Sequence, residues 1–186
     1  PKCNLIPLVW EYNNGRSTGC GCGENEYNHF SICSESIMSW VTRFGGSALN
    51  YNSNKQYPVH LFLHGSGERG NDNSSQLTHG GRLFLEKHNR ENYNSWVIFP
   101  QCSKDDRWAN LVNDDWDIDF EDEITKPNKS LNLVIRFMDE FIQKKQVDTQ
   151  RIYVSGLSMG GMGTFEVLYR RPNMFAAATP ICGNGS

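Results

Sequence analysis

The stretch that decides the fold is Arg151-Ile-Tyr-Val-Ser-Gly-Leu-Ser-Met-Gly-Gly161. It places an apolar, β-branched strand directly before Gly156-Leu-Ser-Met-Gly160, which has the G-x-S-x-G spacing of a nucleophile elbow. In such an elbow the serine occupies a strained strand-to-helix turn, and the two glycines let backbones pass where a Cβ would clash. A helix-compatible stretch, 162–170, follows at once. This context predicts that Ser158 is a catalytic nucleophile and not part of a chance glycine-rich turn.

Strand-like and helix-like segments alternate on the amino-terminal side of this motif and continue beyond it. The apolar runs that read as buried strands are 58–64, 96–100, 152–155 and 176–181. Between 130 and 145 apolar residues recur at helical spacing, which predicts an amphipathic helix. The alternation predicts an α/β fold with a mostly parallel sheet covered by helices on both faces.

The first part of the chain lacks such a pattern. Residues 1–50 are rich in Gly, Asn and Ser and contain only short apolar pieces, at 5–10 and 37–44. We therefore expect an irregular, cysteine-containing segment of undefined fold over 1–50, followed by an α/β domain over 51–186.

The composition of the chain limits the classes of partner that we expect. The 186 residues are 38% apolar and 12% aromatic, and their formal net charge is -3, which is typical of a soluble globular domain without an electrostatic surface for nucleic acid. No apolar run approaches the roughly 20 residues that cross a bilayer. The chain begins at Pro1 without the features of a signal peptide, so we expect that any such peptide has been removed. Neither nucleic acid nor membrane is an expected partner.

The cysteines fall into two groups. The early group is Cys3, Cys20, Cys22 and Cys33, and the later pair is Cys102 and Cys182. The early cysteines fit two disulfides, free thiols, or a small metal site with His29. We favour disulfides or free thiols, because the C-x-C spacing is not that of common zinc sites. Asn73, Asn128 and Asn184 begin glycosylation sequons, which are compatible with export from the cell.

Ordered matches along 51–183 carry a family resemblance. They are Tyr57-Pro58, Leu61-Phe-Leu-His-Gly-Ser-Gly-Glu-Arg-Gly70, Asp72-Asn73, Gln76-Leu77, Pro100-Gln-Cys102, Trp108, the 151–161 stretch, Gly163-Thr164 and Pro180-Ile-Cys-Gly183. With these the chain resembles α/β-hydrolase esterases of the predicted peptidase and polysaccharide-esterase type, related to feruloyl and acetylxylan esterases.

The resemblance and the residues agree on an oxyanion hole. Acyl transfer builds negative charge on the substrate carbonyl oxygen, and fixed backbone N–H groups stabilise that charge. We expect one donor at Met159, directly after the nucleophile, and the other at Ser66, in the turn after the 58–64 strand. His64 is expected to brace this turn and not to act as the base.

Several other polar or aromatic residues can be interpreted as either structural or functional. Glu68 and Arg69 are more typical of a loop pinned by hydrogen bonds than of substrate contacts. For Gln101, substrate binding and loop capping are equally supported. Trp108 and Trp116 fit either an aromatic wall for a substrate ring or loop packing. The acidic run 114–123 reads as a solvated loop, because it lacks the glycine of an EF-hand.

The usual hydrolase strand order also constrains the later cysteines. It places two strands between those that end near Cys102 and Cys182. Neighbouring strands lie about 4.8 Å apart, so the two backbones should be roughly 14 Å apart, beyond the reach of a disulfide.

The sequence therefore predicts a serine hydrolase that cleaves carboxylic esters through an acyl-enzyme on Ser158, without metal or organic cofactor. The alternatives are a peptidase of the same fold and a non-catalytic binding protein that retains the elbow. All five histidines precede Ser158, and Glu166 is the only carboxylate side chain after it. In this fold the triad acid and histidine follow the nucleophile. We therefore expect the natural reading frame to continue for roughly 60 to 120 residues that carry them.

Overall fold

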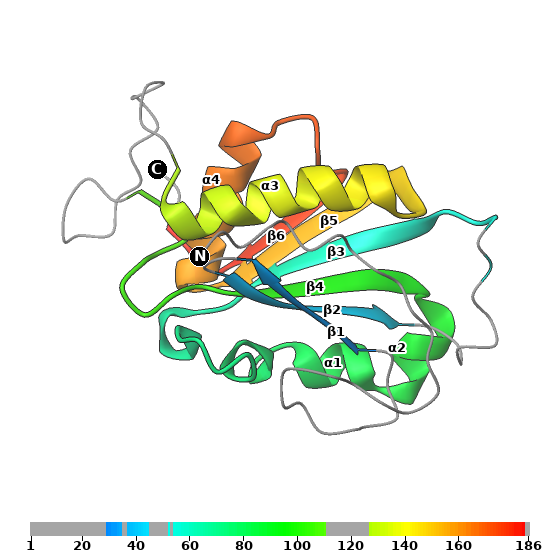
Figure 1. The fold of residues 1–186 in the computed structure, drawn as a ribbon, viewed down its shortest axis with the longest axis horizontal. Coiled ribbons are helices and arrows are strands. Elements are labelled where there is room, and N and C mark those ends of the chain that lie inside the picture. The colour runs from blue at the N-terminus through cyan, green and yellow to red at the C-terminus, as the bar shows by residue number, and fades with distance from the viewer. Residues whose placement is uncertain (1–28, 35–36, 45–51, 53, 111–126, 185–186) are drawn as a thin grey trace, which may run out of the picture.

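The computed structural model describes residues 29–34, 37–44, 52, 54–110 and 127–184. Within these ranges six strands form one sheet of order β1-β2-β4-β3-β5-β6 (Figure 1). The strands are β1 (His29–Ser34), β2 (Ile37–Phe44), β3 (Tyr57–Leu63), β4 (Ser95–Gln101), β5 (Val147–Leu157) and β6 (Ala177–Ile181). The run β4-β3-β5-β6 is parallel, whereas β2 is antiparallel to both β1 and β4. The predicted mostly parallel α/β sheet is confirmed.

Helices cover both faces of the sheet, as Figure 1 shows. On one face lie the two longer helices, α3 (Lys129–Lys144) and α4 (Met159–Arg170); on the other lie α1 (Gly81–Leu85) and α2 (Lys87–Asn92). Two short 3₁₀ turns, η2 (Ser66–Glu68) and η3 (Ser75–Leu77), follow β3. No helix within the described ranges is long and apolar enough to cross a membrane.

The apolar run of β3 is explained by cores on both sides of the sheet. Val59 and Leu61 are fully buried in the larger core, which α3 completes with residues such as Phe141. Phe62 points to the opposite face, where it packs in a smaller cluster with Phe99. A strand that is buried on both faces has little solvent-exposed surface, and its sequence is therefore nearly continuously apolar, His60 excepted.

The structure differs from the sequence-based expectation in two places. Residues 29–34 and 37–44, expected to be irregular, form β1 and β2 of the central sheet. The register of β2 is set by backbone pairing with β4, from Met38 opposite Gln101 to Phe44 opposite Ser95, and β1 in turn pairs with β2. Local composition does not reveal that β2 has a partner so distant in the chain. The strand expected at 176–181 is present as β6, but its residues are exposed or half-buried, because β6 lies at the edge of the described sheet.

The later cysteines behave as predicted. β3 and β5 separate the strands that lead to Cys102 and Cys182, and both cysteines are free. Cys102 is buried, which raises the pKa of its thiol to about 12, whereas Cys182 is exposed. Of the early group, Cys33 lies in β1, and Cys3, Cys20 and Cys22 fall outside the described residues.

Candidate active site

Ser158 lies between the end of β5 and the first residue of α4. Its backbone has φ 53° and ψ -116°, and its side chain is exposed. A non-glycine residue at such angles is strained and persists only where its surroundings hold it. Two backbone hydrogen bonds hold this one: Ser158 donates its N–H to the carbonyl of Ile181 (2.8 Å), and its own carbonyl accepts from Met162 (3.1 Å). The serine hydroxyl is thus presented at the carboxyl end of the sheet on a fixed turn.

The glycines on either side of Ser158 are required by close approach. A Cβ on Gly156 would overlap the carbonyl of Gly160, and a Cβ on Gly160 would overlap the carbonyl of Leu63 at the end of β3. Both overlaps are with backbone, which cannot rotate out of the way. The structure therefore supplies a steric reason for the G-x-S-x-G spacing, as the sequence suggested.

The turn after β3 lies directly against Ser158. A Cβ placed on Gly65 would be 3.5 Å from the carbonyl oxygen of Leu157 and 3.8 Å from Ser158 Cβ. Ser66, which follows Gly65, opens the η2 turn, and Met159 is the first residue of the 12-residue helix α4. The structure thus brings the segments of both expected oxyanion donors to the serine, and their role as donors stays a prediction.

His64 connects this turn to the neighbouring strand. The ring is fully buried; Nδ1 donates to the carbonyl of Gly65 (2.6 Å), and Nε2 accepts from the backbone N–H of Cys102 (2.9 Å). These two bonds require the neutral tautomer with its proton on Nδ1, and burial lowers the pKa of His64 accordingly. With both ring nitrogens engaged, His64 has no free position from which to take a proton from Ser158, and its contacts are those of a brace.

Gln101 is a buried hub of the adjoining loop. Its Oε1 accepts from the N–H of Asn73 (2.8 Å), and its Nε2 donates to the carbonyl of Glu68 (3.1 Å) and to Asp72 Oδ1 (3.0 Å). These contacts are those of loop capping, the second of the two readings that the sequence left open. A contact between Gln101 and substrate stays a prediction.

Trp108 packs inside the protein. Its side chain is fully buried, stacks edge-to-face on His64 and donates from Nε1 to the His64 carbonyl (3.0 Å). In this position Trp108 supports the brace beneath the turn, and a role for it as a wall for substrate stays a prediction. Trp116 and the acidic run 114–123 fall outside the described residues.

Asp72 is a structural residue of the site whose role was not predicted from the sequence. Its carboxylate accepts from the N–H groups of Ser74 and Ser75, from the Ser75 hydroxyl and from Gln101. These bonds, led by the Ser75 hydroxyl, hold the pKa of Asp72 well below its ordinary value. The signal was the run Asp72-Asn-Ser-Ser75, which is typical of a turn closed by an aspartate side chain.

Arg69 pins the turn by hydrogen bonds, as expected. Arg69 donates to the carbonyls of Ser66 (3.1 Å) and Asp106 (3.3 Å), which ties the η2 turn to the loop after β4. Glu68 Oε1 lies 3.5 Å from His79 Nε2.

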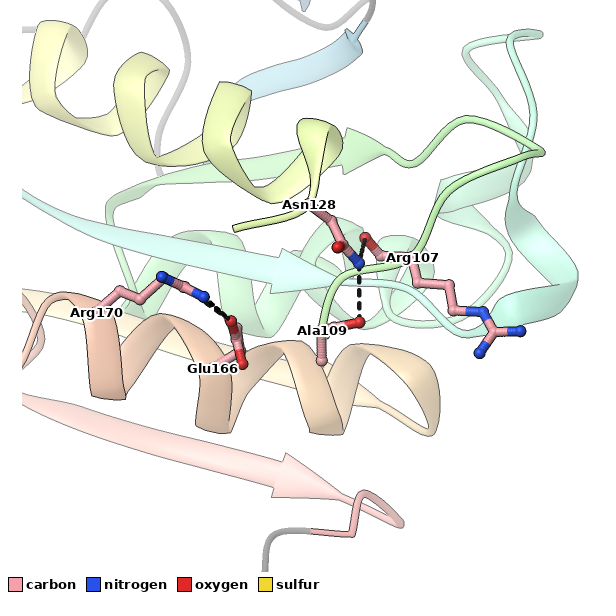
Figure 2. A network of polar contacts seen from close by, with 5 residues as sticks. All are labelled: Arg107, Ala109, Asn128, Glu166 and Arg170. Atoms are coloured by element: carbon pink, nitrogen blue, oxygen red, sulfur yellow. Dashed lines mark hydrogen bonds and ion pairs between the residues drawn. The ribbon is translucent and has the colours of Figure 1, made fainter. Parts of the chain in front are cut away.

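Two of the three sequon asparagines are used internally. Asn73 is buried, and its Oδ1 accepts from Gln76 Nε2 (2.9 Å). The amide of Asn128 donates to the carbonyls of Arg107 (3.3 Å) and Ala109 (2.8 Å), which joins the start of α3 to the preceding loop (Figure 2). A glycan on Asn73 would have no room at a buried side chain, and a glycan on the Asn128 amide nitrogen would replace one of its two donor hydrogens. Neither sequon therefore supports export.

Glu166, the only carboxylate side chain after Ser158 in the sequence, is also engaged. Glu166 lies buried on α4 and forms an ion pair with Arg170, one helical turn further along (2.6 Å; Figure 2). The pairing directs Glu166 along its own helix, and it does not orient an imidazole at the serine.

Comparison with known proteins agrees with this geometry. Residues 118–185 match the prolyl oligopeptidase family. A thermostable esterase of known structure superposes with a TM-score of 0.70 at 31% identity, over 87% of this chain and 42% of that one. The acetyl xylan esterase from Aspergillus awamori superposes with a TM-score of 0.54 at 15% identity, over 83% of this chain and 50% of that one. The chain thus has the α/β-hydrolase fold and is similar to esterases of that fold, which confirms the resemblance stated from its sequence.

One curated relative is similar over a shorter stretch. The bifunctional acetylxylan esterase/xylanase XynS20E of Neocallimastix patriciarum is 34% identical over 68 residues, which are 37% of this chain and 9% of that protein. The chain thus spans less than half the length of the thermostable esterase and a small part of XynS20E.

Proposed function

We propose that the protein is a serine hydrolase that cleaves carboxylic esters, with Ser158 as the nucleophile. The observation that carries the proposal is the conformation of Ser158, an exposed serine held at φ 53° on a strand-to-helix turn. The surrounding packing maintains this strained geometry at one exposed hydroxyl, as expected where strain serves a reaction.

In the proposed reaction Ser158 Oγ attacks the ester carbonyl carbon while its proton passes to a general base. The tetrahedral oxyanion accepts hydrogen bonds from the N–H groups of Ser66 and Met159, each worth on the order of 3 kcal/mol in the barrier. The bond to the leaving oxygen then breaks, the alcohol departs with a proton, and water releases the acid from the acyl-enzyme. We do not assign the base to His64 or His60, because both already make hydrogen bonds within the protein. His64 uses both ring nitrogens, and His60 Nε2 lies 2.7 Å from the Ser155 hydroxyl.

The names of two relatives support a proposal for the substrate class. The thermostable esterase and XynS20E, both above 30% identity, carry esterase activity in their names, so we propose esters of polysaccharides, acetyl esters first and feruloyl esters second. Such polymers cannot enter a cell, and we therefore propose that the protein acts after secretion.

Peptide hydrolysis is the second candidate, because residues 118–185 match the prolyl oligopeptidase family. The third is a non-catalytic protein that retains the turn. Labelling of the full natural gene product with a fluorophosphonate separates the two enzymes from the non-catalytic protein. An activated Ser158 is labelled and Ser158→Ala is not, whereas an inert serine in the parent would contradict the proposal. Rates on acetylated xylan, methyl ferulate and a prolyl peptide then separate esterase from peptidase.

A further inference from the structure

The carboxylate of Glu68 lies beside the serine. The position that a Cβ would occupy on Gly65 is 3.0 Å from Glu68 Oε2 and 3.8 Å from Ser158 Cβ. The two groups therefore lie within about 7 Å of each other, a distance at which a unit charge still acts on a bound substrate. The side chain is 13% exposed, so solvent screens this charge only in part.

The remaining contacts of Glu68 leave this charge directed toward the serine. His79 Nε2 lies near Oε1, and the His79 side chain is 54% exposed. Among the described residues no donor is bonded to Oε2. The adjacent guanidinium of Arg69 donates to the carbonyls of Ser66 and Asp106 and not to Glu68. One carboxylate oxygen is thus held by the histidine while the other faces the turn that borders Ser158.

We propose that Glu68 is a specificity-determining residue that favours neutral and cationic esters over anionic ones at Ser158. The inference rests on the proposed function and narrows its substrates. Acyl esters of uncharged sugars fit the site, whereas esters that carry a carboxylate next to the scissile bond are repelled. The positive charge of the adjacent Arg69, which acts on the same turn, offsets part of the Glu68 charge.

Coulomb's law sets the size of the effect. A unit charge on a substrate about 7 Å from the carboxylate changes its rate of reaction, relative to an uncharged substrate, by about threefold in a water-like medium. At an effective dielectric constant of 20 the change is about fiftyfold. A substituent on a substrate lies further out than Ser158 Cβ, and the positive charge of Arg69 offsets part of the field. We therefore expect a selectivity of about threefold to tenfold at low ionic strength.

The test measures labelling of Ser158 in the full natural gene product by three fluorophosphonates with matched alkyl chains. One chain is uncharged, one ends in a quaternary ammonium and one ends in a carboxylate. The measured quantity is the ratio of the second-order rate constants of the ammonium and carboxylate probes, with Ser158→Ala as the blank.

Three variants separate charge from structure. Glu68→Gln removes the charge at constant shape and should bring the ratio near 1, whereas Glu68→Asp keeps the charge and should preserve selectivity. Asp148→Asn removes an equal charge from near the start of β5, roughly 30 Å from Ser158, and should leave the ratio unchanged.

The outcomes are distinct. If the uncharged probe labels Ser158 but parent and Glu68→Gln have the same ratio, the inference is wrong and the proposed function stands. If no probe labels Ser158 in the parent, the proposed function fails and the inference fails with it. A thermal melt of each variant checks that the fold is intact.

Discussion

A methyl group on Gly160 has no space in this structure. Its Cβ would overlap the Leu63 carbonyl and lie 2.8 Å from the carbonyl oxygen of His64. Overpacking a core costs typically 1 to 3 kcal/mol where side chains can adjust. Here the obstructing atoms belong to the backbone at the end of a central strand, so we expect Gly160→Ala to lower the free energy of unfolding by more than about 3 kcal/mol. In a domain of this size that corresponds to a fall in Tm of roughly 6 to 12 °C.

Gly67 provides the matched control. A Cβ there meets nothing within 4 Å, so Gly67→Ala should change stability by less than about 1 kcal/mol, or stabilise slightly through the unfolded state. Urea denaturation of the two variants and the parent, followed by far-UV circular dichroism, measures the difference. A Gly160→Ala protein within 1 kcal/mol of the parent would refute the steric explanation of the motif.

Three further predictions concern the serine, the half-buried His60 and the free cysteines. Ser158→Ala should reduce esterase turnover of the full gene product by at least 10³-fold while the Tm stays close to that of the parent; turnover within tenfold of the parent would exclude Ser158 as the nucleophile. Burial lowers the pKa of His60 to about 4 in the folded protein. As the pH drops from about 6.5 to about 4, His60 is therefore protonated in the unfolded state but not in the folded state. The free energy of unfolding should fall by up to about 3 kcal/mol over this range. His60→Gln should flatten this part of the stability profile, and an unchanged slope would show that His60 does not titrate as described. Iodoacetamide applied to the native protein should modify exposed Cys182 well before buried Cys102, and equal rates by mass spectrometry would contradict their placement.

The central strands and longer helices were predictable because each carries its own periodic pattern. The run at 58–64 appears as β3, the run at 96–100 as β4, and the helical stripe at 130–145 as α3. These segments bury one or both faces, and burial leaves a regular apolar signal in the sequence. β1 and β2 lack such a signal in isolation, since the place of β2 depends on pairing with β4 and that of β1 on pairing with β2.

The contacts of the loops were predictable in kind but not in detail. A histidine in a His-Gly turn suggested a brace, but only the structure gives its partner, the N–H of Cys102, 38 positions further along the chain. Gln101 likewise reaches back to Asp72 and Asn73. Such bonds join residues that are close only after the sheet has formed, and a single sequence contains no record of which pairs will meet.

The motif around Ser158 combines a local sequence pattern with contacts from residues that are distant in the chain. Five residues specify a tight turn, yet the turn is held by neighbours from both adjoining strands. On one side Leu63 of β3 leaves room only for a glycine at 160. On the other side the carbonyl of Ile181 in β6 accepts the N–H of Ser158, and the backbone of Gly183 leaves no room for a side chain at Gly161. Strain at a single residue is maintained only when the structure around it is fixed. The same packing that fixes the fold therefore positions the hydroxyl, and changes in β3 or β6 are expected to alter the geometry of Ser158 without touching the serine itself.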